Sequence, residues 1–222
     1  MSCTSSNKYL NELYDYARES GVSEIQFLSK DNISEFIKTS VDAYTNYPLF
    51  CNIFKGPVNR KTLSRMMLVD YKSRLHMDMI GGLTSSEKYE AVIMFEPPMT
   101  GKIGIREYMK VAKPLDYLML LNPSFYRQEA YEDYSLEKRK PYLDDKTWYV
   151  YVFATKKECQ RKGFGKPLIN LLTSFAKEKG YRICLETDLK ENVAMYEKFG
   201  FKLKDESVYK GNLNHYVLLY GE

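Results

Sequence analysis

The sequence predicts a mixed α/β domain built around one sheet. Segments of strand-like composition alternate with segments of helical period along most of the chain. The strongest strand signal, KTWYVYVFAT at residues 146–155, is dense in β-branched and aromatic residues and apolar on both faces, as in a central strand. No internal repeat or low-complexity linker divides the 222 residues. We therefore expect a helical extension at residues 1–21 and one domain at residues 22–222.

The first half of the chain is expected to contain three helices, a strand and a hairpin. Apolar residues at three- and four-residue steps predict a helix over residues 7–20, ended by Gly21. A strand at 24–29 precedes a helix that is capped by Asp31 or Asn32 and runs to about Tyr44. After these come a loop at 45–57, a helix at 59–76, and two strands within 79–98 joined by a polar turn.

Residues 104–142 form a helical insertion in this prediction. Pro114 and Pro123 interrupt the helical period, so we expect two or three short helices rather than one long one. The last part, residues 126–142, is rich in tyrosine and charge. This composition fits either a solvated helix face or a wall of a substrate pocket.

The second half follows the strand at 146–155. A helix should run to Lys179 and end at Gly180, because a glycine is favoured just past a helix end. The remaining expected elements are a strand at 181–187, a short helix at 191–199, and two strands at 201–209 and 215–221.

Charge and composition argue against several classes of protein. The net charge is +4, and basic residues are interspersed with acidic ones, which disfavours nucleic acid as the main partner. No apolar run approaches the roughly 18 residues of a membrane span, and the N-terminus lacks the apolar core of a secretory signal. Four separated cysteines and two histidines predict no metal site and no disulfide framework. We expect a cytoplasmic protein without a membrane partner.

The segment ATKKECQRKGFGKPL, residues 154–168, lies between the central strand and the following helix. A helix N-terminus presents unpaired N–H groups that attract phosphate. Gly163 and Gly165 would let a ligand approach the backbone, and Arg161, Lys162 and Lys166 would add positive charge. This arrangement predicts a pyrophosphate-binding loop.

Two common phosphate-binding motifs do not fit this segment. A Walker A loop requires glycine where Gln160 stands and Ser or Thr where Pro167 stands. The dinucleotide fingerprint GxGxxG would require glycine in place of Leu168. Neither motif is present.

QRKGFG, residues 160–165, resembles the Q/R-x-x-G-x-G/A segment of the GCN5-related N-acetyltransferases (GNATs). The resemblance continues to residue 201 and includes Asn192, Tyr196, Gly200 and Phe201 in the family's order. More loosely, YPLFCNIF and VIMFEPP are similar to puromycin-acetyltransferase-like members. The chain departs from the common Val and Pro of the family at Thr155 and Lys157.

The resemblance implies a mostly antiparallel central sheet in which two neighbouring parallel strands, 146–155 and 181–187, splay apart. Acetyl-CoA would lie in the wedge between them, as cosubstrate and without a metal. The implied cofactor-binding residues are Phe153, Ala154, Thr155, Gln160, Arg161, Lys162, Gly163, Phe164, Gly165, Lys166 and Asn192.

The resemblance also assigns the chemistry, in which a neutral amine attacks the thioester. Tyr196 would protonate the leaving thiolate, and a backbone N–H near Ala154 or Thr155 would stabilise the oxyanion. Glu186, Glu96 or a water chain could take the proton of the amine. The two histidines, His76 and His215, are interpreted as structural, and direct transfer does not need Cys184 as a nucleophile.

Three functions remain open from the sequence. The first is N-acetylation of a primary amine, on a small molecule or, alternatively, on a protein N-terminus or lysine. The second is an acyl-CoA sensor without catalysis, and the third, disfavoured by the charge, is nucleic-acid binding. The bulk of residues 104–142 favours a closed pocket and a small acceptor, and the protein could be a monomer or a homodimer.

Overall fold

The computed structural model describes residues 3–22, 24–114, 116 and 121–222, with side chains described from Lys8 onward. The seven strands of the described chain form one sheet in the order β1-β2-β3-β4-β5-β7-β6. All neighbouring strands are antiparallel except β4 and β5, which are parallel. The mixed, mostly antiparallel sheet is therefore confirmed. The strands are β1 Gln26–Phe27, β2 Gly81–Thr84, β3 Ala91–Glu96, β4 Thr147–Thr155, β5 Arg182–Thr187, β6 Lys202–Tyr209 and β7 Leu213–Tyr220.

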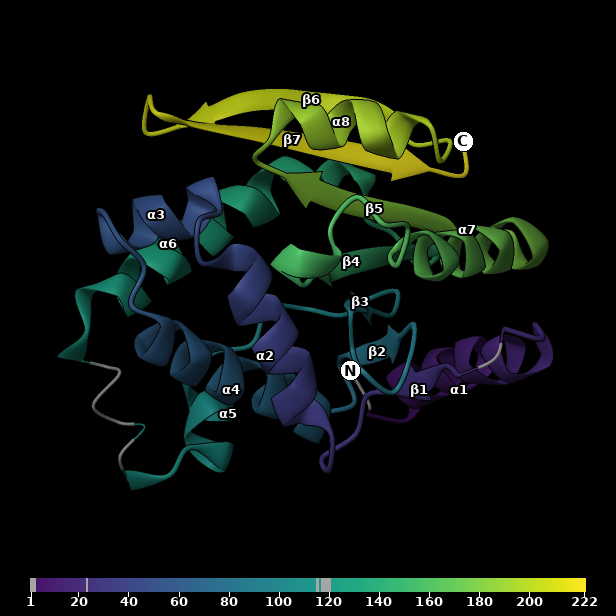
Figure 1. Ribbon diagram of the computed structural model, residues 1–222, viewed down its shortest axis with the longest axis horizontal. Helices are drawn as coiled ribbons and strands as arrows, with labels where there is room; N and C mark the ends of the chain where they lie inside the picture. Colours follow the sequence, from purple (N-terminus) through teal and green to yellow (C-terminus); the bar gives the residue numbers. More distant parts are fainter. Residues whose placement is uncertain (1–2, 23, 115, 117–120) are drawn as a thin grey trace.

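Helices cover both faces of this sheet. Figure 1 shows α2, α3, α4 and α6 gathered on one side and α1 and α7 on the other. The first group packs over a core that includes Phe36, Leu63 and Met94, and the second over a core around Trp148 and Phe175. The α-helices are α1 Cys3–Glu19, α2 Ile33–Tyr44, α3 Pro48–Phe54, α4 Arg60–His76, α5 Ile105–Val111, α6 Pro123–Arg139, α7 Lys166–Lys179 and α8 Lys190–Glu197.

The loop expected at residues 45–57 is wrong, because Pro48–Phe54 is helical. Pro48 occupies the first turn, where its fixed φ favours a helix and its missing N–H costs nothing. Phe50 and Ile53 are buried on one face of this short helix, which explains why it forms. Lys55 ends it in the left-handed conformation, at φ 55°.

The insertion also differs in part from its prediction. Helix α6 has 17 residues and is longer than the short helices expected there, because Pro123 begins a helix rather than interrupting one. The expected break near Pro114 adjoins residues 115 and 117–120, which lie outside the described residues.

A β-bulge in β4 opens the sheet at the parallel pair. On the β3 side, Phe95 pairs with Val150 and Met94 with Val152, so Tyr151 is an extra residue. On the β5 side, the pairing ends at Val150 with Leu185, one residue before the bulge. Along the described strands, the rest of β4 therefore diverges from β5. We call the gap between the two strands beyond Val150 and Leu185 the wedge.

Within the described chain, none of the helices combines the length and apolar character needed to cross a membrane.

Candidate functional site

The wedge exposes backbone groups of β4. The N–H of Lys156 donates to the carbonyl of Glu90, at 2.9 Å, so the peptide group of Lys156 faces the β3 side. Alternation along the strand then directs the peptide groups of Phe153 and Thr155 into the wedge and those of Ala154 toward β3. Two carbonyls are already engaged, since Tyr44 donates its hydroxyl to Phe153 O at 3.3 Å and Gln160 donates Nε2 to Thr155 O at 3.2 Å. The corresponding N–H groups remain available to a ligand.

The predicted phosphate loop joins β4 to α7. Among the described residues, none accepts a hydrogen bond from the amides of residues 161–165. The described acidic side chains likewise form no ion pair with Arg161, Lys162 or Lys166. Unpaired amides and uncompensated cations at a helix N-terminus fit the binding of an anion such as pyrophosphate. This structure is compatible with the role expected for residues 160–166.

The two glycines of the loop serve different purposes. Gly163 has φ 87° and open space around it, so it supplies a left-handed turn. A Cβ at Gly165 would lie 2.8 Å from Cζ of Phe153, so this glycine lets the loop pack against β4. The close approach to Phe153 adds a packing reason for Gly165 to the ligand approach expected from the sequence.

Tyr196 and Asn192 lie on α8, close to the wedge. The ring of Tyr196 is buried, with its centroid 6.4 Å from that of Phe153, and burial together with the nearby Tyr44 raises the pKa of its hydroxyl. Asn192 donates Nδ2 to Oγ1 of Thr187, at 2.9 Å, and so holds the end of β5. Tyr196 is thus placed at the wedge, whereas the Asn192 amide is already used within the protein.

A cavity of about 140 Å³ adjoins the wedge on the face covered by α2, α3, α4 and α6. Four carboxylates line it, from Asp70, Glu132, Glu186 and Asp188, and its described lining contains no Lys, Arg or His. Six tyrosines form much of the wall. They are Tyr44, Tyr47, Tyr71, Tyr131, Tyr149 and Tyr151.

The bulge helps to build this cavity. Tyr151 and Val152 are consecutive in β4, yet both line the cavity, whereas Val150 and Phe153 pack in the core on the opposite face. Side chains of a regular strand alternate between faces, so two consecutive residues can share a face only where the strand is bulged. One backbone irregularity therefore accounts for both the wedge and this part of the cavity wall.

Two buried arginines stand behind the carboxylates. Arg74 pairs with Asp70 at 3.1 Å and with Glu96, and its guanidinium lies 4.2 Å from the centre of the Tyr151 ring. Arg139 pairs with Glu132 at 2.5 Å and with Glu186 at 3.2 Å. These pairs make burial of the acidic groups tolerable.

The two carboxylates expected as candidate bases differ in position. Glu186 lies in the cavity wall, where its Oε2 accepts hydrogen bonds from Ser135, Tyr149 and Arg139. Burial opposes ionisation, but Arg139 and His215 outweigh it and lower the pKa of Glu186. Glu96 lies behind the wall, and its burial raises its pKa to about 7 despite the pairing with Arg74.

Asp188 is a candidate that the sequence analysis missed. It follows the last residue of β5, and its Oδ1 accepts the hydroxyl of Tyr131 at 2.5 Å. The same hydroxyl lies 3.0 Å from Nδ1 of His215. Burial alone would lower the pKa of His215, but hydrogen bonding to Asp188 and Glu186 raises it to about 9. Asp188 directly follows the strand that was expected to border the wedge, and this position in the sequence is the signal that could have identified it.

Residues 127–201 match the model of the Acetyltransferase (GNAT) family. None of the curated proteins matches the chain in sequence. Solved structures match it more widely. The C-terminal condensation domain of Ebony, in complex with beta-alanyl-dopamine, is 12% identical with a TM-score of 0.59, and the match covers 88% of this chain and 97% of that one.

Two acetyltransferase structures match to a similar extent. A mosquito arylalkylamine N-acetyltransferase like 5b is 12% identical with a TM-score of 0.53, covering 88% of this chain and 99% of that one. A structure from Corynebacterium glutamicum, described as histone acetyltransferase HPA2 and related acetyltransferase, is 15% identical with a TM-score of 0.53, covering 88% and 94%. This chain has the GNAT fold.

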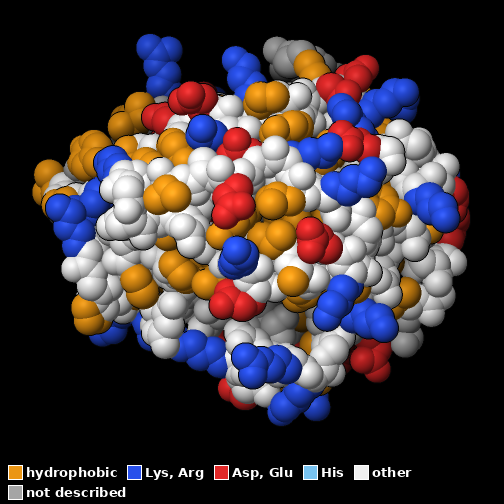
Figure 2. All heavy atoms as spheres, turned by 90° about the horizontal axis from the view of Figure 1, so that it is seen from above, with side chains coloured by type: hydrophobic (Ala, Val, Ile, Leu, Met, Phe, Trp, Pro, Cys, Tyr) orange, Lys and Arg blue, Asp and Glu red, His pale blue; other side chains and the backbone are white. Residues whose placement is uncertain are grey.

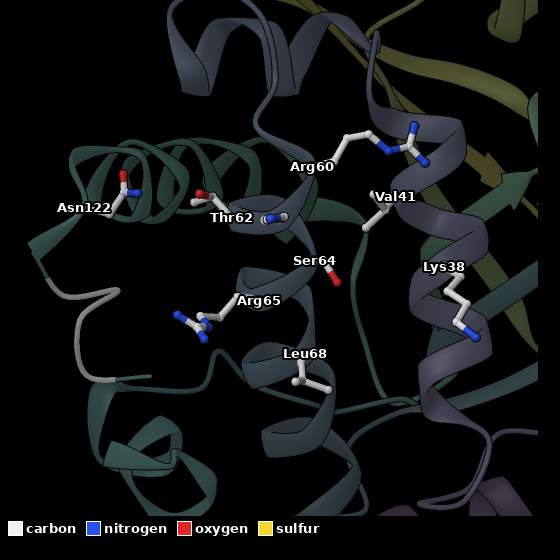
Figure 3. Close-up of a pocket in the computed structure, with 9 residues that line it drawn as sticks. Lys38, Val41, Arg60, Thr62, Ser64, Arg65, Leu68 and Asn122 are labelled. Atoms are coloured by element: carbon white, nitrogen blue, oxygen red, sulfur yellow. The ribbon is translucent and has the colours of Figure 1, made fainter. Parts of the chain in front are cut away.

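A second, larger groove lies between α2 and α4, away from the predicted site. Figure 3 shows Arg60, Arg65 and Lys38 around it, and its volume is about 740 Å³. Each of these cations has an acidic partner, respectively Asp42, Asp116 and Glu35. The lining of this groove contains none of the site residues expected from the sequence.

The face of the protein seen in Figure 2 carries mixed charge, with Lys and Arg interspersed among Asp and Glu. The described residues hold no group of three His, Cys, Asp or Glu arranged for a metal ion. Cys184, which the sequence analysis judged unnecessary as a nucleophile, is fully buried, and burial raises its pKa.

Proposed function

We propose that this protein is an acetyl-CoA-dependent N-acetyltransferase that modifies a primary amine of a small molecule. The observation that carries the proposal is the wedge between β4 and β5, with the unpaired amides of residues 161–165 at one end and a cavity at the other. An extended cosubstrate fits this arrangement, because its pantetheine arm can pair with β4 while its pyrophosphate lies on the loop.

The proposed cofactor contacts are those expected from the sequence, with two changes, at Ala154 and at Asn192. The N–H groups of Phe153 and Thr155 face the wedge, so we assign the oxyanion donor to Thr155 rather than Ala154. Gln160 and the following residues through Lys166 take the pyrophosphate. The contribution proposed for Asn192 is indirect, since its amide holds Thr187 at the end of β5.

The reaction requires three proton and charge movements. The amine nitrogen forms a bond to the thioester carbon, and negative charge develops on the carbonyl oxygen, near the amide of Thr155. The carbon–sulfur bond then breaks, the thiolate takes a proton from Tyr196, and the nitrogen loses its extra proton to water, from which the Tyr196 hydroxyl is reprotonated. Its raised pKa keeps the Tyr196 hydroxyl protonated at neutral pH, as a proton donor must be.

The amine must reach the thioester as a neutral group. We propose Asp188 as the carboxylate that receives the incoming ammonium, with its proton passing to water in the cavity. Asp188 lies beside the wedge, and no hydrogen bond from a described residue reaches its Oδ2. Glu186 shapes the wall, because three donors already occupy its Oε2.

A small acceptor is favoured by the size of the cavity. Its volume of about 140 Å³ is below the roughly 300–1,000 Å³ of sites for drug-sized ligands. The tyrosine-rich segment of the insertion contributes Tyr131 and Glu132 to the wall, in line with the pocket-wall alternative for residues 126–142. An acceptor on a protein N-terminus or lysine would need an open groove.

Three further parts of the proposal rest on the sequence alone. They are similarity to the puromycin-acetyltransferase-like members, a cytoplasmic location, and a monomeric or homodimeric state. The division into an extension and one domain is likewise proposed.

Calorimetric titration with acetyl-CoA, followed by a CoA-release assay over a panel of amines, tests the function. We expect binding and release of CoA that depends on the amine. Binding without release for any amine would favour the sensor function. Failure to bind acetyl-CoA would contradict the assignment of residues 160–166.

A further inference from the structure

The cavity beside the wedge has an unusual balance of hydrogen-bonding groups, which bears on the acceptor of the proposed reaction. The hydroxyls that line it are used within the protein. Tyr44 donates to Phe153 O, Tyr131 to Asp188 and Tyr151 to Asp70. Tyr149 and Ser135 both donate to Glu186. The wall therefore offers few free donors to a ligand.

Acceptors, by contrast, remain open. Among the described residues, Oε1 of Gln128, which lines the cavity, is buried without a donor, and Oδ2 of Asp188 receives no hydrogen bond. Oε1 of Glu186 is engaged within the protein, since Nε2 of His215 lies at an ion-pair distance of 3.4 Å. A buried acceptor without a donor is costly, so a ligand that supplies N–H groups is favoured.

The charge of the cavity points the same way. Five carboxylates gather here, counting the four in the wall and Glu96 behind it, against Arg74, Arg139 and His215. In formal charge, these five carboxylates outnumber the three cationic groups by two. Two negative charges are then uncompensated, whereas a simple monoamine brings only one positive charge.

The open carboxylates come from different parts of the cavity wall. Asp188 follows β5 at the wedge, where the thioester would lie. Glu132 contacts Arg139, whose guanidinium lies 4.4 Å from the ring centre of Tyr149, in the closed part of the β4–β5 pairing. Only one of the two oxygens of Glu132 is engaged by Arg139. The aromatic wall between these ends suits an alkyl chain and its ammonium groups.

We propose that the acceptor is a small linear dication, such as an α,ω-diaminoalkane, with its reacting amine beside Asp188 and its second cationic group beside Glu132. This inference rests on the proposed acetyl transfer for its first amine, but the binding preference itself does not require turnover.

The test compares 1,4-diaminobutane with 1-aminopentane, which has the same number of heavy atoms and one charge fewer, and with tyramine as an aromatic monoamine. Binding is measured by calorimetry at pH 8, with and without coenzyme A, and kcat/KM is measured where CoA is released. We expect the diamine to bind at least about tenfold more tightly than either monoamine, which corresponds to about 1.4 kcal/mol.

Glu132→Gln should reduce that preference about tenfold, through a larger loss of affinity for the diamine than for 1-aminopentane. The matched control is Glu137→Gln, an exposed position on the same helix, which should retain the preference. Thermal unfolding of both variants reports whether they fold.

Equal affinity for the diamine and 1-aminopentane, a preference for tyramine, no binding of any amine, or an unchanged preference in a folded Glu132→Gln variant would each overturn the inference. These outcomes are separable from failure of the proposed function, which would show as absence of acetyl-CoA binding or of CoA release. Diamine selectivity without CoA release would support the dication site and contradict the transferase.

Discussion

Tyr196 is the residue on which the proposed chemistry depends most. Its ring contacts Phe153 and Phe201, so a core role alone would also explain its burial. Tyr196→Phe keeps the ring and removes only the hydroxyl. We expect kcat to fall at least about 100-fold, since loss of a general acid typically costs that much, with acetyl-CoA affinity retained.

The control for this substitution is Tyr220→Phe, because the ring of Tyr220 also packs against Phe201. It should leave kcat close to that of the unmodified protein. Unchanged turnover in Tyr196→Phe would remove Tyr196 as the acid and direct attention to Tyr44, whose hydroxyl also lies at the wedge.

His215 should make the stability of the protein depend on pH. Its side chain is fully buried, and hydrogen bonding to Asp188 and Glu186 raises its pKa from 6.5 to about 9. The folded state therefore holds the proton more tightly than the unfolded state. This contribution to stability is fully present below pH 6.5 and is lost as the pH rises through 9, and it amounts to about 3 kcal/mol.

Urea unfolding at a series of pH values measures this effect. His215→Gln should be less stable at pH 6 and should show a flatter profile between pH 6.5 and 9. Parallel profiles for the two proteins would show that His215 is neutral in the folded state.

Among the elements, the loop between β4 and α7 must pack closely against β4 to present its amides. Gly165→Ala would place a methyl group 2.8 Å from Cζ of Phe153, so either the ring or the loop must move. We expect acetyl-CoA affinity to fall about tenfold or more, measured by calorimetry. Gly101→Ala is the control, since a Cβ there meets no atom within 4 Å. Equal affinity in both variants would contradict the loop's role.

An element can be predicted from the sequence when the residues that cause it are contiguous, and not when it depends on pairing with a distant segment. The proposed phosphate loop is a contiguous segment, so the spacing of its glycines and cations is visible in the sequence. The bulge at Tyr151 depends on the register between β4 and β3, which no local pattern encodes. The prediction of a loop over residues 45–57 is wrong at helix α3 although the cause is local, because a proline fits both a loop and the first turn of a helix.

At the scale of the whole molecule, the cavity was the least predictable feature. Its carboxylates come from α4, α6 and the end of β5, so no spacing in the sequence unites Asp70, Glu132 and Asp188. Only the fold brings them together. Glu186 and Glu96, expected from the sequence as candidate bases, are held by partners from α4, α6 and β4 that no local pattern indicates.

The N-terminal helix is part of the main core of the molecule. Leu13 of α1 is 0% exposed and belongs to the same cluster as Trp148 and Phe175. Leu13→Ala should lower the free energy of unfolding by about 3 kcal/mol, through lost burial and the cavity left behind. Chemical denaturation measures the change. Leu203→Ala, at a position 37% exposed, should cost less than about 1 kcal/mol, and a similar cost at both positions would contradict this account of α1.

The central claim is that coenzyme A binds in the wedge between β4 and β5, and hydrogen exchange with and without coenzyme A tests it most directly. We predict slower exchange at the amides of Phe153 and Thr155 and at residues 161–165, which have no acceptor among the described residues. Little change is expected in the groove between α2 and α4. Protection confined to that groove, or none at residues 161–165 under saturating coenzyme A, would contradict the account.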